Sequence, residues 1–426
     1  MTVALADEAV APGGGRMRAA LVATFRRVMR LYFRDIERTG ARPGPEVRGR
    51  VLVANHTNAL IDAILVITDA ACPVSPIAKS TLWHVPGLGW LLDRAGAVPI
   101  VRRVDAPDKA ASANDAAFDR IAAHLAAGGN ILIFPEGTSH SEARLAPLRT
   151  GAARILIAAA ARGGVAPTFQ AVGLEFEART DFRSRCLVRW GPVRALVGGA
   201  DVHAVTAQMA SDLGDLLIEG ESHDERRRIA HVAELLARDA GDATLGGWSQ
   251  LGHQIELAHR TLRTVDAALV ARVASRVDTY FAELARLGAT DAQVVGAAPP
   301  PPRLPLVLAP LAAAGFVLYA LPYFVPRRVA RRSDADAVST IKLGAALVVY
   351  PVWMAGLVIA ALVALPAPWS WLAAAVAVTS PFAALRWLDA WYQRAPALGA
   401  TDRARLGAMR RAACEAIDAA RRRLPS

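Results

Sequence analysis

The sequence is poor in cysteine. Its 426 residues include only three, Cys72, Cys186 and Cys414, which lie far apart. An odd and scattered set excludes the disulfide framework of a small secreted domain and is typical of reduced thiols in the cytosol. No two cysteines have the spacing of metal ligands and no cluster of cysteine and histidine forms, so we expect no metal site.

Lysine is also scarce. Only three of the 49 basic residues are lysines, and with 38 acidic residues the net charge is +11. A basic chain favours anionic partners, which include nucleic acid, acidic lipid headgroups and phosphorylated substrates. A hydrophobic content of 54% and a mean hydropathy of +0.28 favour the membrane among these. The chain lacks an aromatic and basic platform or a recognition motif for nucleic acid, so no nucleic-acid partner is expected.

Two further absences narrow the class. Residues 1–15 carry Asp7 and Glu8 and have neither a basic region nor a long apolar core, so they do not resemble a signal peptide. We expect a disordered leader there and a chain whose bulk stays in the cytoplasm. The pattern Gly-x-Ser-x-Gly is missing, which argues against a serine hydrolase.

The segment 16–47 begins with an amphipathic helix at 16–38. Apolar residues recur on one helical face and arginines surround them. A basic amphipathic helix is a candidate for the membrane interface. The alternative is an ordinary surface helix packed on the domain core, and the sequence leaves both open.

Residues 48–200 have the pattern of an α/β domain. Runs rich in β-forming residues occur at 51–54, 97–101, 131–134, 170–176 and 186–190, with helical stretches between them, such as 112–127 and 150–162. This alternation predicts a mixed, largely parallel sheet covered by helices. Residues 201–298 predict an added helical region without an assigned role. Four prolines within 299–303 predict a stiff linker.

The membrane domain is expected at 304–392. Apolar stretches at 304–325, 343–365 and 369–388 are each about as long as the 20 residues that cross a bilayer. Segment 326–342 carries four arginines and Lys342, and the tail at 393–426 is basic as well. The positive-inside rule places both in the cytoplasm.

The charges therefore predict one transmembrane hairpin, formed by 343–365 and 369–388. The segment 304–325 is then interfacial or re-entrant. Three spans would violate the charge rule at both the loop and the tail. Buried helices of a soluble domain are a third interpretation, which the long apolar runs disfavour.

The first motif that carries chemistry runs from Asn55-His56 to Asp62, directly after the predicted strand at 51–54. A carboxylate can orient an imidazole while the other ring nitrogen takes a proton from a substrate hydroxyl. The alternative is a helix N-terminus with a structural histidine.

The second motif is Phe134-Pro135-Glu136-Gly137-Thr138-Ser139. Gly137 allows close approach of the backbone, and Thr138 supplies a hydroxyl. Glu136 is expected either to hold a hydroxyl of a polyol or to brace the loop. The alternative is a β-turn with a solvated glutamate.

Two basic residues are candidates for binding phosphate. Arg102 leaves the predicted strand at 97–101, and Lys79 lies in Ala78-Lys79-Ser80. Taken singly, each is more often a solvated surface residue.

Together and in this order, the motifs resemble the glycerophospholipid acyltransferase family. Its blocks are Asn-His with four residues before Asp, then Gly-x-x-Phe-Ile-x-Arg, then Phe-Pro-Glu-Gly-Thr. Here five residues separate His56 from Asp62, Pro99 replaces the phenylalanine, and Ala171-Val172-Gly173-Leu174 replaces a fourth block, Val-Pro-Val-Gly. The resemblance covers roughly residues 25–200. Within the family, the sequence is similar to a subgroup with C-terminal membrane segments.

The resemblance implies roles for seven residues. His56 is the general base and Asp62 its partner. The residues implied in binding the glycerol phosphate are Arg102, Glu136, Gly137 and Thr138, with Lys79 as a further candidate.

The implied activity is that of a membrane-bound O-acyltransferase in phospholipid biosynthesis. It moves an acyl group from acyl-CoA or acyl carrier protein to glycerol 3-phosphate or dihydroxyacetone phosphate, without a cofactor. The first alternative is acylation of lysophosphatidate to phosphatidic acid, and the second is a non-catalytic lipid-binding membrane protein. The expected partners are the phosphorylated acceptor, the acyl thioester and membrane lipids. The expected location is the cytoplasmic (inner) membrane, with the catalytic domain on its cytoplasmic face.

Overall fold

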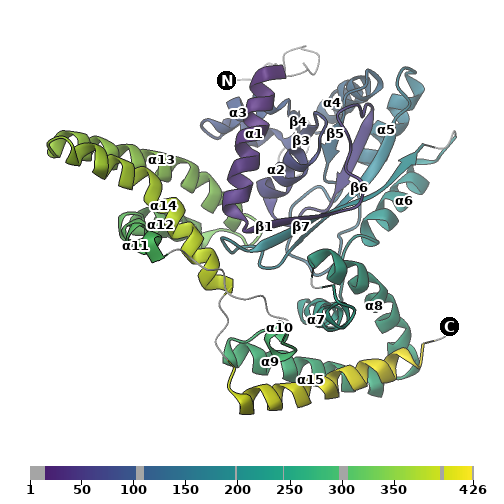
Figure 1. Ribbon diagram of the computed structural model, residues 1–426. Coiled ribbons are helices and arrows are strands. Elements are labelled where there is room, and N and C mark those ends of the chain that lie inside the picture. Colours follow the sequence, from purple (N-terminus) through teal and green to yellow (C-terminus); the bar gives the residue numbers. More distant parts are fainter. Residues whose placement is uncertain are drawn as a thin grey trace. The chain divides into compact units, whose positions relative to one another are not determined.

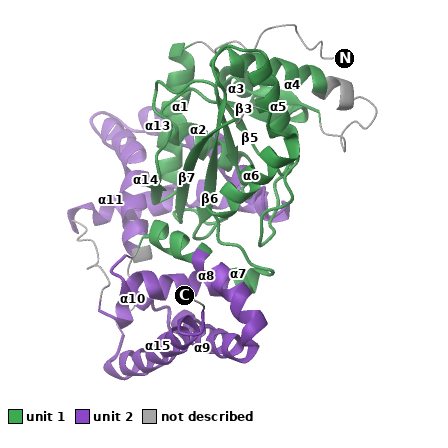
Figure 2. Ribbon diagram, turned by 90° about the vertical axis from the view of Figure 1, so that its right-hand side faces the viewer, with its two compact units in different colours: residues 1–226, 244–253 green, residues 227–243, 254–426 purple. Residues whose placement is uncertain are grey.

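The computed structural model describes residues 15–101, 110–196, 199–242, 244–296, 306–393 and 398–424. The predicted linker at 299–303 and all but the last residue of the predicted leader at 1–15 lie outside these ranges. The chain divides into two compact units (Figure 2). The first comprises residues 1–226 and 244–253, and the second comprises residues 227–243 and 254–426.

The first unit is built on a seven-stranded sheet in the order β1-β7-β6-β2-β5-β3-β4. Neighbouring strands are parallel except for β6 and β7. The strands are β1 (Asp35–Thr39), β2 (Arg50–Ala54), β3 (Ser75–Lys79), β4 (Val98–Ile100), β5 (Ile131–Ile133), β6 (Thr168–Phe176) and β7 (Arg185–Ala195). Val51, Leu52 and Val53 of the central strand are fully buried, as expected where helices cover both faces. The predicted mixed, largely parallel sheet is confirmed.

Helices cover the sheet on two sides (Figure 1). They are α1 (Gly15–Tyr32), α2 (Ala59–Asp69), η1 (Ser80–His84), α3 (Leu88–Ala95), α4 (Ala110–Ala126), α5 (Gly151–Ala161) and α6 (Val202–Gly214). The connection through α2 crosses the sheet in one direction, and those through α4 and α5 cross it in the other. Right-handed crossovers therefore place α2 on one face and α4 and α5 on the opposite face.

The start of this unit differs from the prediction. The helix expected at 16–38 ends at Tyr32, and residues 35–39 form the edge strand β1, paired in parallel with β7. Buried Arg183 ends the helix, because its Nη1 donates hydrogen bonds to the carbonyl oxygens of Arg30, Leu31 and Phe33. The α/β domain thus begins before the predicted boundary at residue 48.

Helix α1 packs on the core of its unit. Met29 and Tyr32 are buried, and Arg26 Nε donates to the carbonyl oxygen of Thr68 over 2.8 Å. This is the position expected of a surface helix packed on the core. A contact between its outer face and a membrane stays a prediction.

The helical bundle of the second unit is formed by α7 (His223–Asp239), α8 (Leu245–Val265), α9 (Ala267–Leu287), α10 (Asp291–Val294) and α15 (Ala400–Arg421), with α7 and α8 beginning in the first unit. The predicted helical region at 201–298 is therefore divided, since α6 belongs to the first unit. The predicted basic tail at 393–426 contains the long helix α15. Leu406, Ala413 and Ile417 of α15 are buried in one cluster with residues of α9, which holds the C-terminal helix on the bundle.

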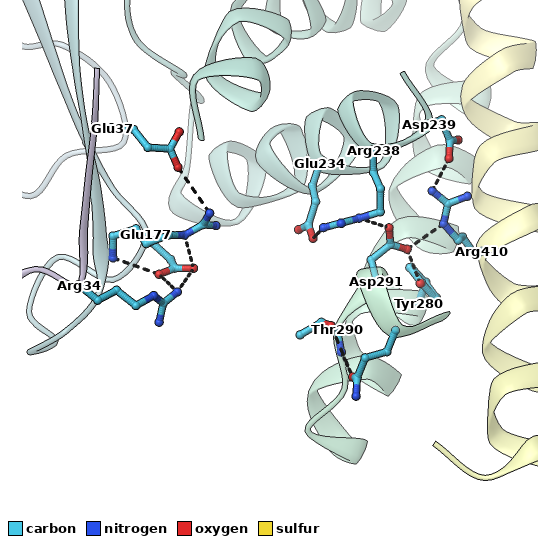
Figure 3. A network of polar contacts seen from close by, with 12 residues as sticks. Arg34, Glu37, Glu177, Glu234, Arg238, Asp239, Tyr280, Thr290, Asp291 and Arg410 are labelled. Carbon is cyan, nitrogen blue, oxygen red and sulfur yellow. Dashed lines mark hydrogen bonds and ion pairs between the residues drawn. The ribbon is translucent and has the colours of Figure 1, made fainter. Parts of the chain in front are cut away.

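A buried ionic network joins the helices of this bundle (Figure 3). The side chain of Asp291 is fully buried, and its Oδ1 accepts from Tyr280 Oη at 2.5 Å and from Arg410 Nε at 2.8 Å. Its Oδ2 lies 2.8 Å from Arg238 Nε. The network connects α7, α9, α10 and α15.

The remaining helices of the second unit are mostly apolar, with arginines at the end of α12 (Ala320–Val329) and in η3 (Ala330–Arg332). They are η2 (Leu306–Leu308), α11 (Ala309–Leu318), α12 (Ala320–Val329), η3 (Ala330–Arg332), α13 (Val338–Ala364) and α14 (Trp369–Gln393). Of these, α13 and α14 are each long and apolar enough to cross a membrane. The pair formed by 306–318 and 320–332 is bent by 44° and would supply a third candidate span only if taken as one helix.

Hydrogen bonds join the two residues at the bend between α11 and α12, Leu318 and Tyr319, to α13 and α14. Trp353 Nε1 of α13 donates to the carbonyl oxygen of Leu318 at 2.8 Å. Tyr319 Oη donates to the carbonyl oxygen of Ala377 in α14, also at 2.8 Å. A Cβ on Gly315 would lie 2.2 Å from the carbonyl oxygen of Ser380, so α11 and α14 approach as closely as a glycine allows.

Candidate active site

The histidine motif follows the central strand β2. Asn55 is buried directly after the end of β2, and its side chain forms hydrogen bonds with the backbone of β6. Its Nδ2 donates to the carbonyl oxygen of Leu174 at 3.0 Å, and its Oδ1 accepts from the Leu174 amide at 2.7 Å. The side-chain amide therefore replaces one peptide pair of the ladder, so the backbone can turn away from the sheet at His56 without leaving Leu174 unsatisfied.

His56 and Asp62 are in contact. His56 Nδ1 lies 3.0 Å from Asp62 Oδ2, which also accepts from the backbone amides of Thr57 at 2.8 Å and Asn58 at 2.7 Å. The Asp62 side chain is fully buried in the first turn of α2. Because this carboxylate only accepts, it holds the proton on Nδ1 of a neutral ring and leaves Nε2 as the acceptor.

The five-residue spacing is accommodated in the loop. One extra residue rotates an ideal helix by about 100°. Here α2 begins at Ala59, whose φ of 43° is left-handed although it is not a glycine. This conformation turns the chain so that Asp62 still reaches His56.

The glutamate motif follows β5 and packs directly on the histidine. The Phe134 ring stacks on His56 with centroids 3.9 Å apart and an interplanar angle of 14°. Glu136 Oε1 accepts from the His56 backbone amide at 2.6 Å, and the His140 amide donates to the carbonyl oxygen of His56 at 3.1 Å. The two motifs thus form one hydrogen-bonded unit at the carboxyl edge of the parallel strands.

Two comparisons with known proteins bear on this geometry. Residues 35–171 match the family model described as Acyltransferase, and that range includes both motifs. Residues 35–171 of this chain therefore form an acyltransferase domain. The matched range begins with β1 and ends within β6.

Three chains of solved structures are similar to this one, while no curated protein matches it significantly. One is the crystal structure of the 1-acyl-sn-glycerophosphate (LPA) acyltransferase, PlsC, from Thermotoga maritima. It has 16% identity and a TM-score of 0.35, and the match covers 47% of this chain and 82% of that chain.

Within the acyltransferase domain, the Glu136 carboxylate is fully used by the protein. Its Oε2 accepts from the Ala146 amide at 3.0 Å and contacts His140 Nε2, in addition to the bond from His56 to Oε1. The side chain is buried. This is the bracing arrangement that the sequence left open, and direct contact between Glu136 and a substrate stays a prediction.

The other predicted binding residues of the domain lie in different parts of it. Gly137 has a φ of 79°, which favours glycine, and Thr138 is exposed at the tip of the same loop. Lys79 ends β3, whose carboxyl end shares an edge with those of β2 and β5 because the three strands are parallel. Arg102 lies outside the described residues.

Sequence reasoning missed Arg179 as a residue of this site. It follows β6, whose carboxyl end lies at the same edge. Its Nη1 donates to the carbonyl oxygen of Thr57 at 2.9 Å and its Nη2 to Ser141 Oγ at 3.1 Å, so it ties the histidine loop to the glutamate loop. The available signal was its place directly after a strand that is parallel to β2.

The cysteines lie outside this site. Burial raises the pKa of the Cys72 and Cys186 thiols, and burial is also the main reason that the pKa of Cys414 rises to about 11. All three are free and stay protonated at neutral pH, which makes them poor nucleophiles. Among the described residues, no group of three or more His, Cys, Asp and Glu side chains is arranged to hold a metal ion. The absence of a cofactor stays a prediction.

Proposed function

We propose that this acyltransferase moves a fatty acyl group from a thioester to a hydroxyl of glycerol 3-phosphate or dihydroxyacetone phosphate, with His56 as the general base. The observation that carries the proposal is the contact of 3.0 Å between His56 Nδ1 and Asp62 Oδ2. The His56 side chain is 15% exposed, and its Nε2 has no partner among the described residues, so this nitrogen is available to a substrate.

The reaction then follows from the imidazole. His56 Nε2 takes the proton of the acceptor hydroxyl while the oxygen bonds to the thioester carbonyl carbon. The carbon–sulfur bond breaks, and the departing thiolate takes the proton back from Nε2. Asp62 stabilises the imidazolium between the two transfers. Base catalysis of this kind contributes about 10²–10⁴-fold, and positioning of the substrates supplies more.

We assign the acceptor phosphate to Lys79 and Arg102, and the walls of the pocket to Gly137 and Thr138. The placement of Lys79 at the carboxyl edge of β3 supports its assignment. Glu136 acts by fixing the His56 backbone, because three protein groups already occupy its carboxylate.

The test is an acceptor comparison with purified full-length protein in detergent, using palmitoyl-CoA and palmitoyl-acyl carrier protein as donors. Glycerol 3-phosphate, dihydroxyacetone phosphate and lysophosphatidate are offered separately. Turnover of a three-carbon phosphate supports the proposal. Turnover of lysophosphatidate alone moves the enzyme to the step that makes phosphatidic acid, and no turnover with any pair contradicts an acyltransferase of this class.

We further propose that α13 and α14 cross the cytoplasmic membrane as a hairpin and that α11 and α12 enter it without crossing. The support is that α15, which follows these helices, packs on α9, which precedes them. A chain that begins and ends in one bundle must cross a bilayer an even number of times. The charge pattern independently favours two spans, because Arg327, Arg328, Arg331 and Arg332 follow α11.

The exposed surface of the bent pair suits this assignment. Leu306 is 82% exposed, Val317 77% and Phe324 60%, which is typical of lipid-facing residues. The proposed cytoplasmic side contains the acyltransferase domain and the bundle with α15.

A further inference from the structure

The loop that carries Glu136 is covered by an arginine with no role in the mechanism above. A Cβ on Gly137 would lie 2.5 Å from Arg149 Nε and 2.8 Å from its Cδ, so the Arg149 side chain lies across this glycine. Residue 137 is therefore a glycine for two reasons, its φ of 79° and the arginine above it.

Arg149 is held in register with His56 by its backbone. The Arg149 amide donates to the carbonyl oxygen of Pro135 at 2.8 Å. The next residue, Glu136, accepts from the His56 amide at 2.6 Å. These two hydrogen bonds thus link the backbone of Arg149 to that of His56, the candidate general base.

The charge of Arg149 is not balanced by the protein. Its side chain is exposed, and within the described residues it has no hydrogen bond or ion pair. Both oxygens of the buried Glu136 carboxylate are engaged by His56, His140 and Ala146, and Oδ2 of Asp62 is engaged by His56 and the amides of Thr57 and Asn58. An unpaired guanidinium next to a loop whose buried carboxylate, that of Glu136, is occupied is suited to hold an anion from solution.

We propose that Arg149 binds the phosphate of the acyl acceptor and thereby selects phosphorylated acceptors. This inference rests on the proposed function. The planar guanidinium can donate two parallel N–H bonds to phosphate oxygens, which fixes the direction of the acceptor as well as its charge. Coenzyme A also carries phosphates, so the acceptor and the donor must be tested separately.

The test compares Arg149→Ala and Arg149→Lys with wild type. Arg162→Ala is the matched control, since Arg162 follows the other end of α5 and is ion-paired with Asp119. A lost charge-assisted hydrogen bond corresponds to about a tenfold to hundredfold change in affinity. We therefore expect Arg149→Ala to raise KM for glycerol 3-phosphate by at least about tenfold. The kcat and the KM for palmitoyl-CoA should stay near their wild-type values, and Arg149→Lys should restore part of the loss.

A second measurement does not depend on turnover. Equilibrium binding of radiolabelled glycerol 3-phosphate is measured with wild type, Arg149→Ala, Arg162→Ala and His56→Ala. We expect His56→Ala and Arg162→Ala to bind as wild type does, and Arg149→Ala to bind at least about tenfold more weakly.

The outcomes separate the two proposals. Wild-type binding of glycerol 3-phosphate without turnover of any acceptor contradicts the proposed function, whereas loss of that binding in Arg149→Ala still supports this inference. Unchanged KM and binding in Arg149→Ala overturn the inference and leave the proposed function standing. A rise in KM for palmitoyl-CoA alone assigns Arg149 to the donor and overturns the inference, as does wild-type protein that does not bind glycerol 3-phosphate.

Discussion

Arg410 Nε donates to Asp291 Oδ1 over 2.8 Å, although the candidate membrane spans found among the described residues all lie between these two residues in the chain. This ion pair, with the apolar contacts of α15 on α9, closes the segment that contains the candidate spans α13 and α14 into a loop that leaves and re-enters one bundle.

The closed loop predicts the labelling of three single cysteines in a Cys414→Ser background, in which the remaining cysteines are buried. His223→Cys and Ala335→Cys should react with an impermeant maleimide from the same side of sealed vesicles. Leu365→Cys, in the turn between α13 and α14, should react from the other side. If Ala335→Cys and His223→Cys react from opposite sides, the bent pair crosses the membrane and the proposed topology is wrong.

Asp291→Asn should destabilise the bundle. Removing one member of a buried ion pair leaves its partners uncompensated and costs about 3 kcal/mol. The control is Asp278→Asn, which breaks the exposed pair of Asp278 with Arg228 and should cost less than about 1 kcal/mol. The measurement is unfolding in detergent, followed by circular dichroism. Equal losses in the two variants would contradict the structural role of Asp291.

Glu136→Gln distinguishes bracing from substrate contact. Glutamine keeps one acceptor oxygen, and its NH2 group cannot accept a hydrogen bond. Either the bond from the His56 amide to Oε1 or the bond from the Ala146 amide to Oε2 is therefore lost, so the loop should shift and kcat should fall. The KM for the acceptor should change little. A variant with normal kcat and a raised KM would instead place Glu136 in direct contact with the substrate.

His231 should make the bundle sensitive to acid. Its ring stacks on Phe281 at 3.7 Å, and burial, aided by Arg227, lowers its pKa to about 4. Below about pH 6.5 the unfolded chain binds a proton that the folded chain does not. The free energy of unfolding therefore decreases as the pH is lowered, by about 2 kcal/mol at pH 5.

The control for His231 is His231→Phe, which keeps an aromatic ring against Phe281 and removes the titration. The measurement is the unfolding midpoint of wild type and variant in detergent at pH 7 and pH 5. The drop between these values should be smaller in His231→Phe, and equal drops would exclude His231 as the cause.

The sequence predicts the central strands well and the outer ones less well. The segments at 51–54, 131–134 and 170–176 are apolar and coincide with β2, β5 and β6. The strand β1 has the sequence Asp-Ile-Glu-Arg-Thr, which carries little β signal. It is a strand because β7 offers a parallel partner and Arg183 ends the preceding helix, and both are tertiary contacts.

The sequence likewise predicts some residues of the candidate site but not the contacts between distant segments. His56 and Asp62 are recognisable from residue type and spacing, because their chemistry needs a base and a carboxylate near each other. The Asn55 contact with Leu174 joins residues 119 positions apart and depends on the register of β2 with β6. The position of Arg149 over Gly137 depends on a loop path that residue types alone do not determine.

The most direct test of the central claim is the initial rate of acyl transfer from palmitoyl-CoA to glycerol 3-phosphate by wild type, His56→Ala and His203→Ala. His203 is an exposed histidine of α6 outside the site and serves as the control. We expect His56→Ala to lose about 10²–10⁴-fold in kcat, the usual contribution of a general base, while His203→Ala stays near wild type. A His56→Ala enzyme that transfers acyl groups at the wild-type rate would contradict the role of His56 as the general base.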